Sequence, residues 1–447
     1  EKATKPRALP PTAEALVGLS PPGEARSSGR RQVMFADDRY AASLYARLDA
    51  LSAGGGEEDA ALVSSVAFPF ENADFAAAAF ARGNAPIEER VANPAPMPPI
   101  YGRWANPTTD ALETRLAHLE GAESALVTAS GMAAISGTCL TFLAAGDHLV
   151  TPRSLYAETA RLFRERLPRL GITTTFIDDV TPASYAAAIT DRTRALYLET
   201  PSNPLLRVTD VAAVVAVAKE RNLLTFADGT FATPFAQSLV AAGVDVTLHS
   251  LTKGLGGHGD AIGGVCLGAR KLLLPLRDTV TKGLGSVLAP DAAQRILRGL
   301  RTFPLRQFRA NLTAARIARL LAARDDVRVH HPSLPTHPDH SIAARTMHAF
   351  GTVVSFEILD AGEGARARGR IFLDALQVFT RAVSLGDTAS LAIHPASTTH
   401  ASMPAGDRQR AGIGDGLVRL SIGLEGAEAL GADLTQALEK ARLPARF

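Results

Sequence analysis

Cysteine is scarce in the 447-residue sequence, which contains only Cys139 and Cys266, each among small apolar neighbours. Two cysteines are too few for a disulfide framework, so we expect buried free thiols in a reducing compartment, with one disulfide as the open alternative. The start of this chain, EKATKPRALPPT, lacks the apolar core of a secretory signal. No apolar run reaches the roughly 18 residues of a membrane span. We therefore predict a cytoplasmic location and no membrane partner, and a processed organelle protein is the alternative.

An excess of charge of one sign is lacking as well. The 47 basic and 45 acidic side chains leave a net charge of +2, so there is no global electrostatic reason to expect a nucleic-acid partner. Hydrophobic residues make up 46% and charged residues 21%, which is the ordinary balance of a globular protein. A chain of this length can bury a large core, and we expect two domains plus extensions.

The first 100 residues differ in composition from the rest. Residues 1–60 are rich in Pro, Gly, Ala and charge, and they predict an arm with one short helix over 36–51. The stretch 84–100 contains repeated prolines and predicts a loop. We expect three parts: an N-terminal arm and proline-rich loop over 1–100, a large domain over 101–290, and a C-terminal small domain over 291–447.

Short apolar runs alternate with helical periods between about 101 and 265. This alternation predicts an α/β fold with a mostly parallel sheet covered on both faces, followed by a smaller α+β domain. Ligands of such sheets gather beyond the carboxyl ends of the strands. Glu199, Asp228, Ser250 and Lys253 all follow predicted strands, so the sequence predicts a site at this edge.

Lys253 stands in HSLTKGLGGHGDAIGG, residues 249–264, with six glycines around it. Glycine in this number marks tight turns or a backbone that must approach a ligand closely. A lysine and an aspartate at strand ends are typical of a pyridoxal phosphate (PLP) site, where the lysine bonds the cofactor aldehyde and a carboxylate keeps the ring nitrogen protonated. Asp228 is available as that carboxylate, and the helix that begins at Gly131 and Met132 can bind the phosphate.

Seven segments together resemble the trans-sulfuration, or Cys/Met metabolism, family of fold-type I PLP enzymes. They are YGRWANPT, LAHLEGAESALVTASGMAAI, LETPSNP, ADGTFATP, HSLTKGLGGHGD, VSLGDTASLAIHPASTTH and LVRLSIGLE. The resemblance implies a large domain with a mostly parallel seven-stranded sheet, a smaller C-terminal α+β domain, and a homotetramer built as a dimer of active-site dimers. It also implies PLP as cofactor and a small amino acid as substrate.

The resemblance also implies roles for individual residues. Lys253 and Tyr156 correspond to the family's catalytic residues, Lys253 as cofactor attachment and proton carrier and Tyr156 as the ring stacked on the cofactor. Arg419 corresponds to the arginine that binds the substrate carboxylate, assisted by Asn203 and Ser384. The further cofactor contacts that it implies are Asp228, Gly131, Met132, Ser250, Thr252, Thr230, and, from the neighbouring subunit, Tyr101 and Arg103.

Several positions depart from the family pattern. Gly229 stands where asparagine is common, Gly254 where an aromatic residue is usual, and Ala389 where lyases and synthases often have glutamate. Glu158 stands where methionine γ-lyases have cysteine, and it is either a pocket acid or a surface residue. We expect γ-replacement on an O-acyl homoserine by a thiol or sulfide; the alternatives are a carbon–sulfur lyase acting on cystathionine or methionine, and a PLP-binding regulator without turnover.

Each candidate also has an ordinary structural interpretation. Asp228 could cap a turn, Arg419 could form a structural ion pair, and Tyr156 could belong to the core. The cluster HHPSLPTHPDH suggests a metal site, but its prolines deny it the regular element that would set ligand geometry. We therefore expect no metal.

Overall fold

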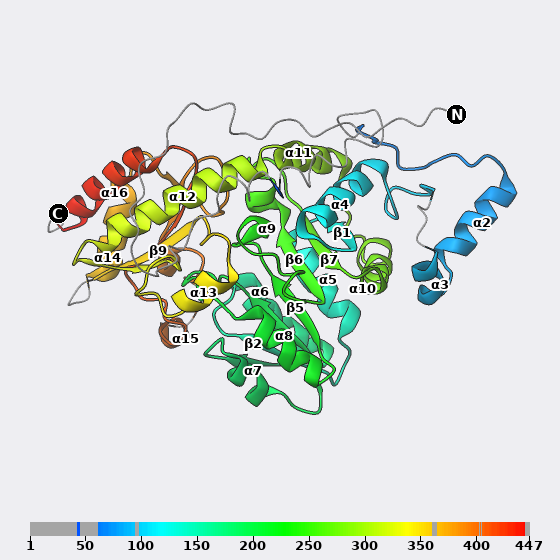
Figure 1. Ribbon diagram of the computed structural model, residues 1–447, viewed down its shortest axis with the longest axis horizontal. Coiled ribbons are helices and arrows are strands. Elements are labelled where there is room, and N and C mark those ends of the chain that lie inside the picture. Colours follow the sequence, from blue (N-terminus) through cyan, green and yellow to red (C-terminus); the bar gives the residue numbers. More distant parts are fainter. Residues whose placement is uncertain are drawn as a thin grey trace, which may run out of the picture. The chain divides into compact units, whose positions relative to one another are not determined.

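The computed structural model describes residues 43–44, 61–93, 98–359, 364–401, 403 and 405–442. These residues form two β-sheets with helices packed against them (Figure 1). Of the helix predicted over 36–51, only Ser43 and Leu44 are described, and they are helical; the rest lies outside the described residues.

The first sheet has seven strands in the order β1-β7-β6-β5-β4-β2-β3. Neighbouring strands are parallel except around β7, which runs antiparallel to both β1 and β6. The predicted mostly parallel seven-stranded sheet is therefore confirmed. The strands are β1 (Ser124–Thr128), β2 (His148–Pro152), β3 (Thr173–Ile177), β4 (Thr193–Glu199), β5 (Leu224–Asp228), β6 (Val246–Ser250) and β7 (Gly264–Gly268).

Helices cover both faces of this sheet because its strands are apolar on both sides. In β4, Tyr197 packs with Phe163 and the α5 core, whereas Leu196 and Leu198 pack with Val214 of α8 on the opposite face. The helical elements are α4 (Pro107–Glu120), α5 (Gly131–Phe142), α6 (Ala157–Arg161), α7 (Pro182–Ala188), α8 (Val211–Glu220), α9 (Thr233–Ala236), α10 (Arg270–Leu276), α11 (Pro290–Leu300), η3 (Leu162–Arg166), η4 (Leu167–Leu170), η5 (Leu251–Leu255) and η6 (Arg277–Gly283).

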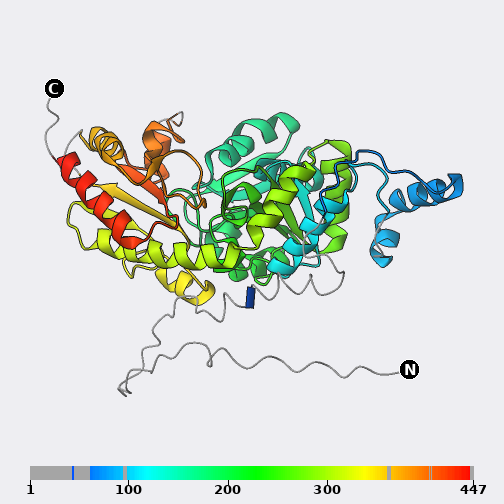
Figure 2. The same cartoon turned by 90° about the horizontal axis from the view of Figure 1, so that it is seen from above.

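The second sheet has five strands in the order β10-β11-β12-β9-β8. Its apolar face packs on α12, α14 and α16, and Figure 2 shows α12 and α16 beside the strands. Arg419 of β12 alternates with Val418 and Leu420, which belong to that core. The elements are β8 (Val327–His330), β9 (Val353–Ile358), β10 (Thr380–Arg381), β11 (Leu391–Ile393), β12 (Leu417–Ser421), α12 (Phe303–Ala322), α13 (His340–Thr346), α14 (Ala365–Ala375), η7 (Pro395–Ser397), α15 (Ala405–Arg410) and α16 (Ala427–Arg442).

The segment predicted as a loop over 84–100 contains the helix α3 (Ile87–Ala92), so that prediction is wrong for these six residues. Pro86 directly precedes α3 and Glu88 and Glu89 lie in its first turn, where carboxylates favour the positive end of the helix dipole. A second helix of this region, α2 (Ala73–Gly83), was not predicted; the side chain of Asn72 caps it by accepting from Phe75 N at 2.8 Å.

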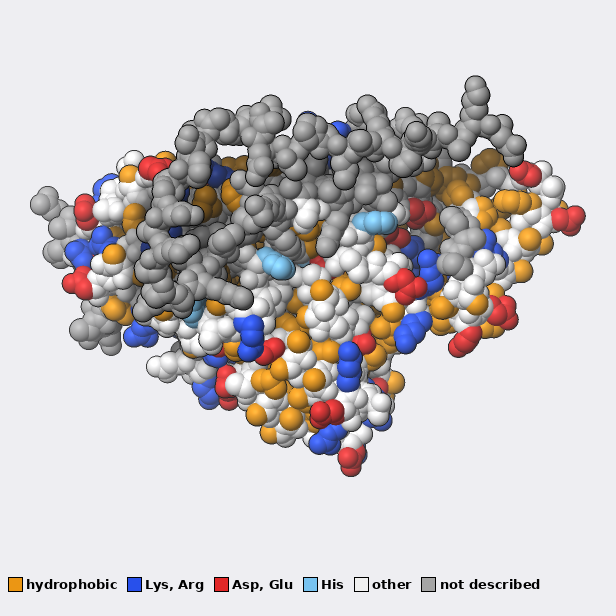
Figure 3. All heavy atoms as spheres, viewed as in Figure 1, with side chains coloured by type: hydrophobic (Ala, Val, Ile, Leu, Met, Phe, Trp, Pro, Cys, Tyr) orange, Lys and Arg blue, Asp and Glu red, His pale blue; other side chains and the backbone are white. Residues whose placement is uncertain are grey.

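The surface and the cysteines agree with the ordinary composition of the chain. On the face in Figure 3, basic and acidic side chains are interspersed with hydrophobic ones. Cys139 and Cys266 are buried free thiols, as predicted. No helix among the described residues is long and apolar enough to cross a membrane.

Candidate active site

Three parallel strands of the large sheet end side by side at one edge. Glu199 ends β4 and pairs in register with Asp228, which ends β5. Ser250 ends β6, the next strand along. Asp228 and Glu199 are 9% and 4% exposed, so the edge brings two buried carboxylates together. The sequence predicted that ligand-binding residues would gather here, and the structure does bring these residues together.

Lys253 lies just beyond β6, in η5, with its backbone at φ −97° and ψ −140° in an otherwise helical turn. This kink turns the chain at the lysine, and the Lys253 Nζ donates to Ser384 Oγ at 2.7 Å. Burial, and then the positive charge of Arg419, lower the pKa of Lys253 to about 8. The side chain is therefore closer to a neutral amine than a surface lysine is.

Asp228 is held by Thr230. The Thr230 N–H donates to Asp228 Oδ1 at 2.8 Å, and the Thr230 hydroxyl oxygen accepts from Ser250 N at 2.9 Å. Burial raises the pKa of Asp228, while its hydrogen bonds to Thr230 and the charge of His249 oppose that rise. A cationic group beside this buried carboxylate would keep it ionised.

The N-terminus of α5 lies against the end of β6. Ser130 caps α5 by accepting from Ala133 N at 3.1 Å, and a Cβ atom at Gly131 would lie 2.9 Å from Ser250 Cβ. Only glycine permits this close approach. The Thr252 hydroxyl donates to Gly263 O at 3.3 Å and accepts from Gly263 N at 3.1 Å. The start of α5, with Gly131 and Met132, therefore lies against Ser250, and the Thr252 hydroxyl is held by the backbone of Gly263.

Arg419 is 4% exposed and is held from two sides. It donates to Asn203 Oδ1 at 2.9 Å and to the Ser384 carbonyl oxygen at 3.0 Å, and its guanidinium lies 5.9 Å from the centre of the Phe231 ring. Burial lowers the pKa of Arg419 to about 10. The Arg419 Nε is a buried donor without a hydrogen-bond partner among the described residues. A buried cation of this kind can bind a carboxylate.

Tyr156 is 40% exposed and directly precedes α6. Its backbone N–H donates to both carboxylate oxygens of Glu199, at 2.9 Å and 3.1 Å. Burial raises the pKa of Tyr156, and the charge of the exposed Glu158 adds to the rise, whereas Arg419 opposes it. The sequence showed that Glu199 ends a strand but gave it no role; its position in register beside Asp228 was the available signal.

Tyr101 and Arg103 are not joined to this site. Tyr101 is 40% exposed, the Arg103 guanidinium lies 5.7 Å from the centre of its ring, and Arg103 donates to the carbonyl oxygen of Lys282. Among the described residues, no hydrogen bond or ion pair connects either one to Lys253 or Arg419. This is compatible with the expectation that they serve a neighbouring subunit.

Two of the departures from the family pattern have steric counterparts. A Cβ atom at Gly229 would lie 2.8 Å from His249 Cε1, and one at Gly254 would lie 2.8 Å from Gln307 Nε2. Side chains at both positions would displace buried neighbours. His249 and Gln307 therefore occupy space that larger residues at these two positions would need.

The histidine segment makes local contacts. His331 Nδ1 lies 2.7 Å from Ser333 Oγ, and His340 Nδ1 lies 2.8 Å from the Pro332 carbonyl oxygen. In the described part of the chain, no group of three or more His, Cys, Asp or Glu residues has an arrangement that could hold a metal ion.

A cavity of about 1260 Å³ lies away from this edge of the sheet. It is lined by residues of α2, α3, α4 and α10. Arg90, Asp110, Glu113 and Arg277 line it, and none of the predicted site residues does. Burial, and then the charge of Glu113, raise the pKa of Asp110 to about 7. The cavity lacks a lysine–aspartate pair at strand ends, so the candidate site is the sheet edge.

The residues at the sheet edge fit PLP. A lysine whose pKa is lowered by burial suits attachment of an aldehyde, and the buried Asp228 carboxylate suits a pyridinium nitrogen. The glycine at the start of α5 lets Ser250 approach the helix N-terminus, where backbone N–H groups can bind a phosphate. The unpartnered Arg419 Nε suits the carboxylate of an amino acid.

Known proteins resemble the chain over most of its length. A family model described as Cys/Met metabolism PLP-dependent enzyme matches residues 61–439. The chain is 43% identical over 344 residues to the L-methionine gamma-lyase of Fusobacterium nucleatum subsp. polymorphum. The aligned region covers 76% of this chain and 86% of that protein. It is 42% identical over 342 residues to the chloroplastic cystathionine gamma-synthase 1 of Arabidopsis thaliana. Here the aligned region covers 76% of this chain and 60% of that protein.

The fold also matches a solved structure. Cystathionine gamma synthase from Xanthomonas oryzae pv. oryzae, in complex with aminoacrylate and cysteine, superposes with a TM-score of 0.80 and 38% sequence identity, covering 90% of this chain and 98% of that one. The predictions of fold class and of PLP as cofactor are confirmed. The chain belongs to the Cys/Met metabolism family of PLP-dependent enzymes, and it is a trans-sulfuration enzyme, either a transferase or a carbon–sulfur lyase.

Proposed function

We propose that the protein catalyses γ-replacement, in which a thiol or sulfide displaces the acyloxy group of an O-acyl homoserine, which leaves as a carboxylate. One observation supports an α-amino acid as substrate: Lys253 and Arg419 both bind Ser384, through hydrogen bonds of 2.7 Å and 3.0 Å. An amine with a lowered pKa and a buried guanidinium beside it suit proton transfer and carboxylate binding in one substrate.

Asp228 would hold the protonated ring nitrogen of the cofactor, Tyr156 would stack on the ring, and Lys253 would be the attachment point. When bound, PLP supplies the electron sink that stabilises the negative charge left by proton removal. The proposed contacts to its phosphate are Gly131, Met132, Ser250 and Thr252, together with Tyr101 and Arg103 of the neighbouring subunit. Thr230 is proposed as a further cofactor-binding residue, beside Asp228.

The chain's own groups would orient the substrate and move protons. Arg419, steadied by Asn203 Oδ1, would hold the substrate carboxylate and so fix the substrate Cα near Lys253. The Lys253 amine, whose pKa burial lowers to about 8, would in its deprotonated form remove protons from Cα and Cβ. The Tyr156 hydroxyl, whose pKa is raised, would stay protonated and could donate to the leaving oxygen.

Glu158 supports a substrate or nucleophile that carries an ammonium group beyond its sulfur atom, such as cysteine or cystathionine, over methionine. It lies two residues from Tyr156, is exposed, and its charge is among the causes of the raised pKa of Tyr156. A carboxylate near Tyr156 would attract the ammonium of a cysteine nucleophile, and likewise the distal ammonium of cystathionine, whereas it has no favourable contact to offer the methyl thioether of methionine.

The alternative is elimination, which would make the protein a carbon–sulfur lyase acting on cystathionine or methionine. Relatives named L-methionine gamma-lyase and cystathionine beta-lyase, 43% and 41% identical, support it as directly as the synthases support replacement. A regulator that binds PLP without turnover is a third possibility, which the intact Lys253, Asp228 and Arg419 do not favour.

Product analysis distinguishes these functions. The purified PLP-loaded protein would be given O-acetylhomoserine or O-succinylhomoserine with sulfide or cysteine, and separately cystathionine and methionine. Homocysteine or cystathionine formed from the esters would support γ-replacement. Accumulation of 2-oxobutanoate from the thioethers, or of pyruvate from cystathionine, would identify a lyase and overturn the proposal. If none of these compounds is converted, the third possibility, a regulator that binds PLP without turnover, would be supported.

Assembly, location and domain division belong to the same proposal. We propose a homotetramer made of two active-site dimers, a cytoplasmic location, and a division into an arm over 1–100, a large domain over 101–290 and a small domain over 291–447. Exposed aromatic side chains of the arm support assembly, since Phe75 and Phe80 of α2 are 37% and 40% exposed.

A further inference from the structure

Glu199 joins two separate parts of the site through backbone hydrogen bonds. Its Oε1 accepts from Asn203 N at 2.9 Å, and both of its carboxylate oxygens accept from Tyr156 N, at 3.1 Å and 2.9 Å. Tyr156 precedes α6, whereas Asn203 lies in the loop that follows β4. One carboxylate therefore fixes the distance between two segments that are 47 positions apart in the chain.

The chain of contacts continues beyond Glu199. Asn203 Oδ1 accepts from Arg419, and the Ser384 carbonyl oxygen accepts from the same guanidinium. Ser384 in turn holds Lys253. Glu199 is thus the member of this chain that connects the Tyr156 backbone to the Arg419 guanidinium.

We propose that Glu199 is a positioning residue that sets the spacing between the ring of Tyr156 and the guanidinium of Arg419. The roles of Tyr156 and Arg419 rest on the proposed function, but the spacing itself does not depend on whether replacement or elimination follows. Misplacing either group by a fraction of an ångström lowers both substrate affinity and rate, because binding and proton transfer need both in register.

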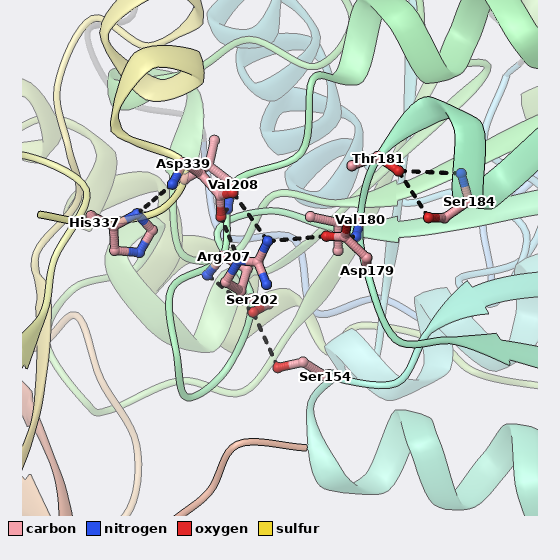
Figure 4. Close-up of polar contacts among 10 residues, drawn as sticks. All are labelled: Ser154, Asp179, Val180, Thr181, Ser184, Ser202, Arg207, Val208, His337 and Asp339. Atoms are coloured by element: carbon pink, nitrogen blue, oxygen red, sulfur yellow. Dashed lines mark hydrogen bonds and ion pairs between the residues drawn. The ribbon is translucent and has the colours of Figure 1, made fainter. Parts of the chain in front are cut away.

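The loop that carries Asn203 has its own anchors, so Glu199 is not needed merely to fold it. Arg207 forms ion pairs with Asp339 at 2.6 Å and with Asp179 at 3.2 Å, and Ser202 Oγ lies 3.2 Å from Ser154 Oγ. Figure 4 shows these contacts converging on the loop from three other segments. What Glu199 adds is the position of Asn203 itself and of Tyr156.

Two substitutions at Glu199 distinguish the effect of side-chain length from the effect of side-chain charge. Glu199→Gln keeps the length of the side chain and the oxygen that accepts from both N–H groups, but it puts an amide NH₂ at the second position. Glu199→Asp keeps the carboxyl group and shortens the side chain by one methylene, so it cannot reach both partners. Burial, and then the charge of Asp228, raise the pKa of Glu199 to about 8, so a neutral side chain is compatible with its native state.

Asp245 provides a matched control at the opposite end of the same sheet, directly before β6. Its Oδ2 accepts from the backbone N–H of Thr225 at 2.8 Å and from the Thr225 hydroxyl at 2.7 Å, where β5 begins. Asp245→Ala removes the same kind of carboxylate-to-backbone contact as Glu199→Ala, but far from the carboxyl edge of the sheet.

The test measures binding of L-alanine, an α-amino acid without a leaving group, by the change in cofactor absorbance, together with kcat and KM for whichever substrate the wild type converts. We expect Glu199→Ala and Glu199→Asp to weaken alanine binding about tenfold or more, and to lower kcat while raising KM. Glu199→Gln should weaken binding by no more than about threefold, and Asp245→Ala should leave binding, kcat and KM as they are.

The proposal is overturned if Glu199→Asp binds alanine as the wild type does while Glu199→Gln fails, because charge and not reach would then matter. It is also overturned if Asp245→Ala causes a loss as large as Glu199→Ala, since the effect would then be general destabilisation. If Glu199→Ala does not fold, the Gln and Asp variants still decide. Alanine binding is independent of product identity, so a failure of the proposed reaction is recognised separately.

Discussion

The Nζ atom of Lys253 lies 2.7 Å from the hydroxyl oxygen of Ser384, a residue 131 positions later in the chain. Ser384 has φ 104°, a backbone conformation that residues other than glycine rarely adopt. In this conformation its hydroxyl faces Lys253 and its carbonyl faces Arg419. The strain is therefore stored where one residue holds two cationic groups of the site.

Replacing Ser384 by alanine should slow turnover with a smaller effect on KM. The hydroxyl accepts a hydrogen bond from a charged group, a contact of about 1.5–3 kcal/mol, so we expect kcat to fall by about 10- to 100-fold. Ser384→Gly is the control: it also lacks the hydroxyl but relieves the strain, so it should be as slow as alanine yet melt at a higher temperature. Recovery of kcat in Ser384→Gly would show that the hydroxyl is dispensable.

Restoring a side chain at position 254 should destabilise the protein. A Cβ atom there would lie 2.8 Å from Gln307 Nε2 and 3.2 Å from Thr233 Cγ2, in a buried region. Overpacking of this kind costs about 1–3 kcal/mol, so Gly254→Ala should lower the thermal midpoint by several degrees and an aromatic residue should lower it further.

Gly406 is the control for this substitution. It lies exposed in α15 with open space where a Cβ atom would be, so Gly406→Ala should be neutral or stabilising by up to about 1 kcal/mol. Truncating Gln307 to alanine should offset part of the loss at position 254, because it removes the nearest obstacle. Unchanged melting of Gly254→Ala would mean that the Gln307 amide moves aside freely.

The fold was predictable from the sequence because local pattern and tertiary role agree. Apolar runs such as ALYLE and LLTFA are buried on both faces, which is what a covered parallel sheet requires, and they became β4 and β5. The helix α3 was missed because four prolines in PAPMPP dominate the composition of its neighbourhood, whereas the six residues of α3 that precede them suffice for a short helix.

The site was predictable only in part. Lys253 and Asp228 follow from the chemistry that a PLP site needs, and Arg419 follows from the resemblance to the family. Nothing local in LETPSNP shows that Glu199 accepts from Tyr156, which is 43 positions earlier. The glycines at 229 and 254 were recognised as departures, yet their cause lies in His249 and Gln307, which approach them only in the folded chain. The spacing of residues in the sequence does not predict which side chains distant in the chain come into contact in the fold.

Glu199 should make the cofactor-free protein less stable as the pH rises. Its pKa is raised from 4.5 to about 8, first by burial and then by the charge of Asp228. Between these values the folded state keeps a proton that the unfolded state has lost, so the free energy of unfolding falls with increasing pH. In Glu199→Gln this contribution is absent, and stability should depend less on pH in that window.

Urea unfolding of both cofactor-free proteins at about pH 5, 6.5 and 8 measures this difference. Asp228 has a raised pKa in the wild type as well and contributes the same sign to both curves, so only the difference between the proteins is informative. Parallel curves over this range would mean that Glu199 is ionised in the folded state throughout.

Complementation between inactive chains should reveal shared active sites. Tyr101 is 40% exposed and not joined to Lys253 within one chain, so we expect it to act in a partner's site. Co-expressed Lys253→Ala and Tyr101→Phe chains would form hybrid dimers in which one of two sites has both residues. Random pairing makes half of the dimers hybrid, so about one quarter of all sites should be intact and activity should approach one quarter of the wild type.

The control combines the wild type with a chain that carries both substitutions. A hybrid of these two has no intact site, because the wild-type Lys253 meets the substituted position 101 and the wild-type Tyr101 meets the substituted position 253. Activity per wild-type chain should therefore fall by about half on random pairing, the opposite of the gain in the first mixture. If each chain instead completes its own site, the first mixture gains nothing and the second loses nothing, and the neighbouring subunit has no part in the chemistry.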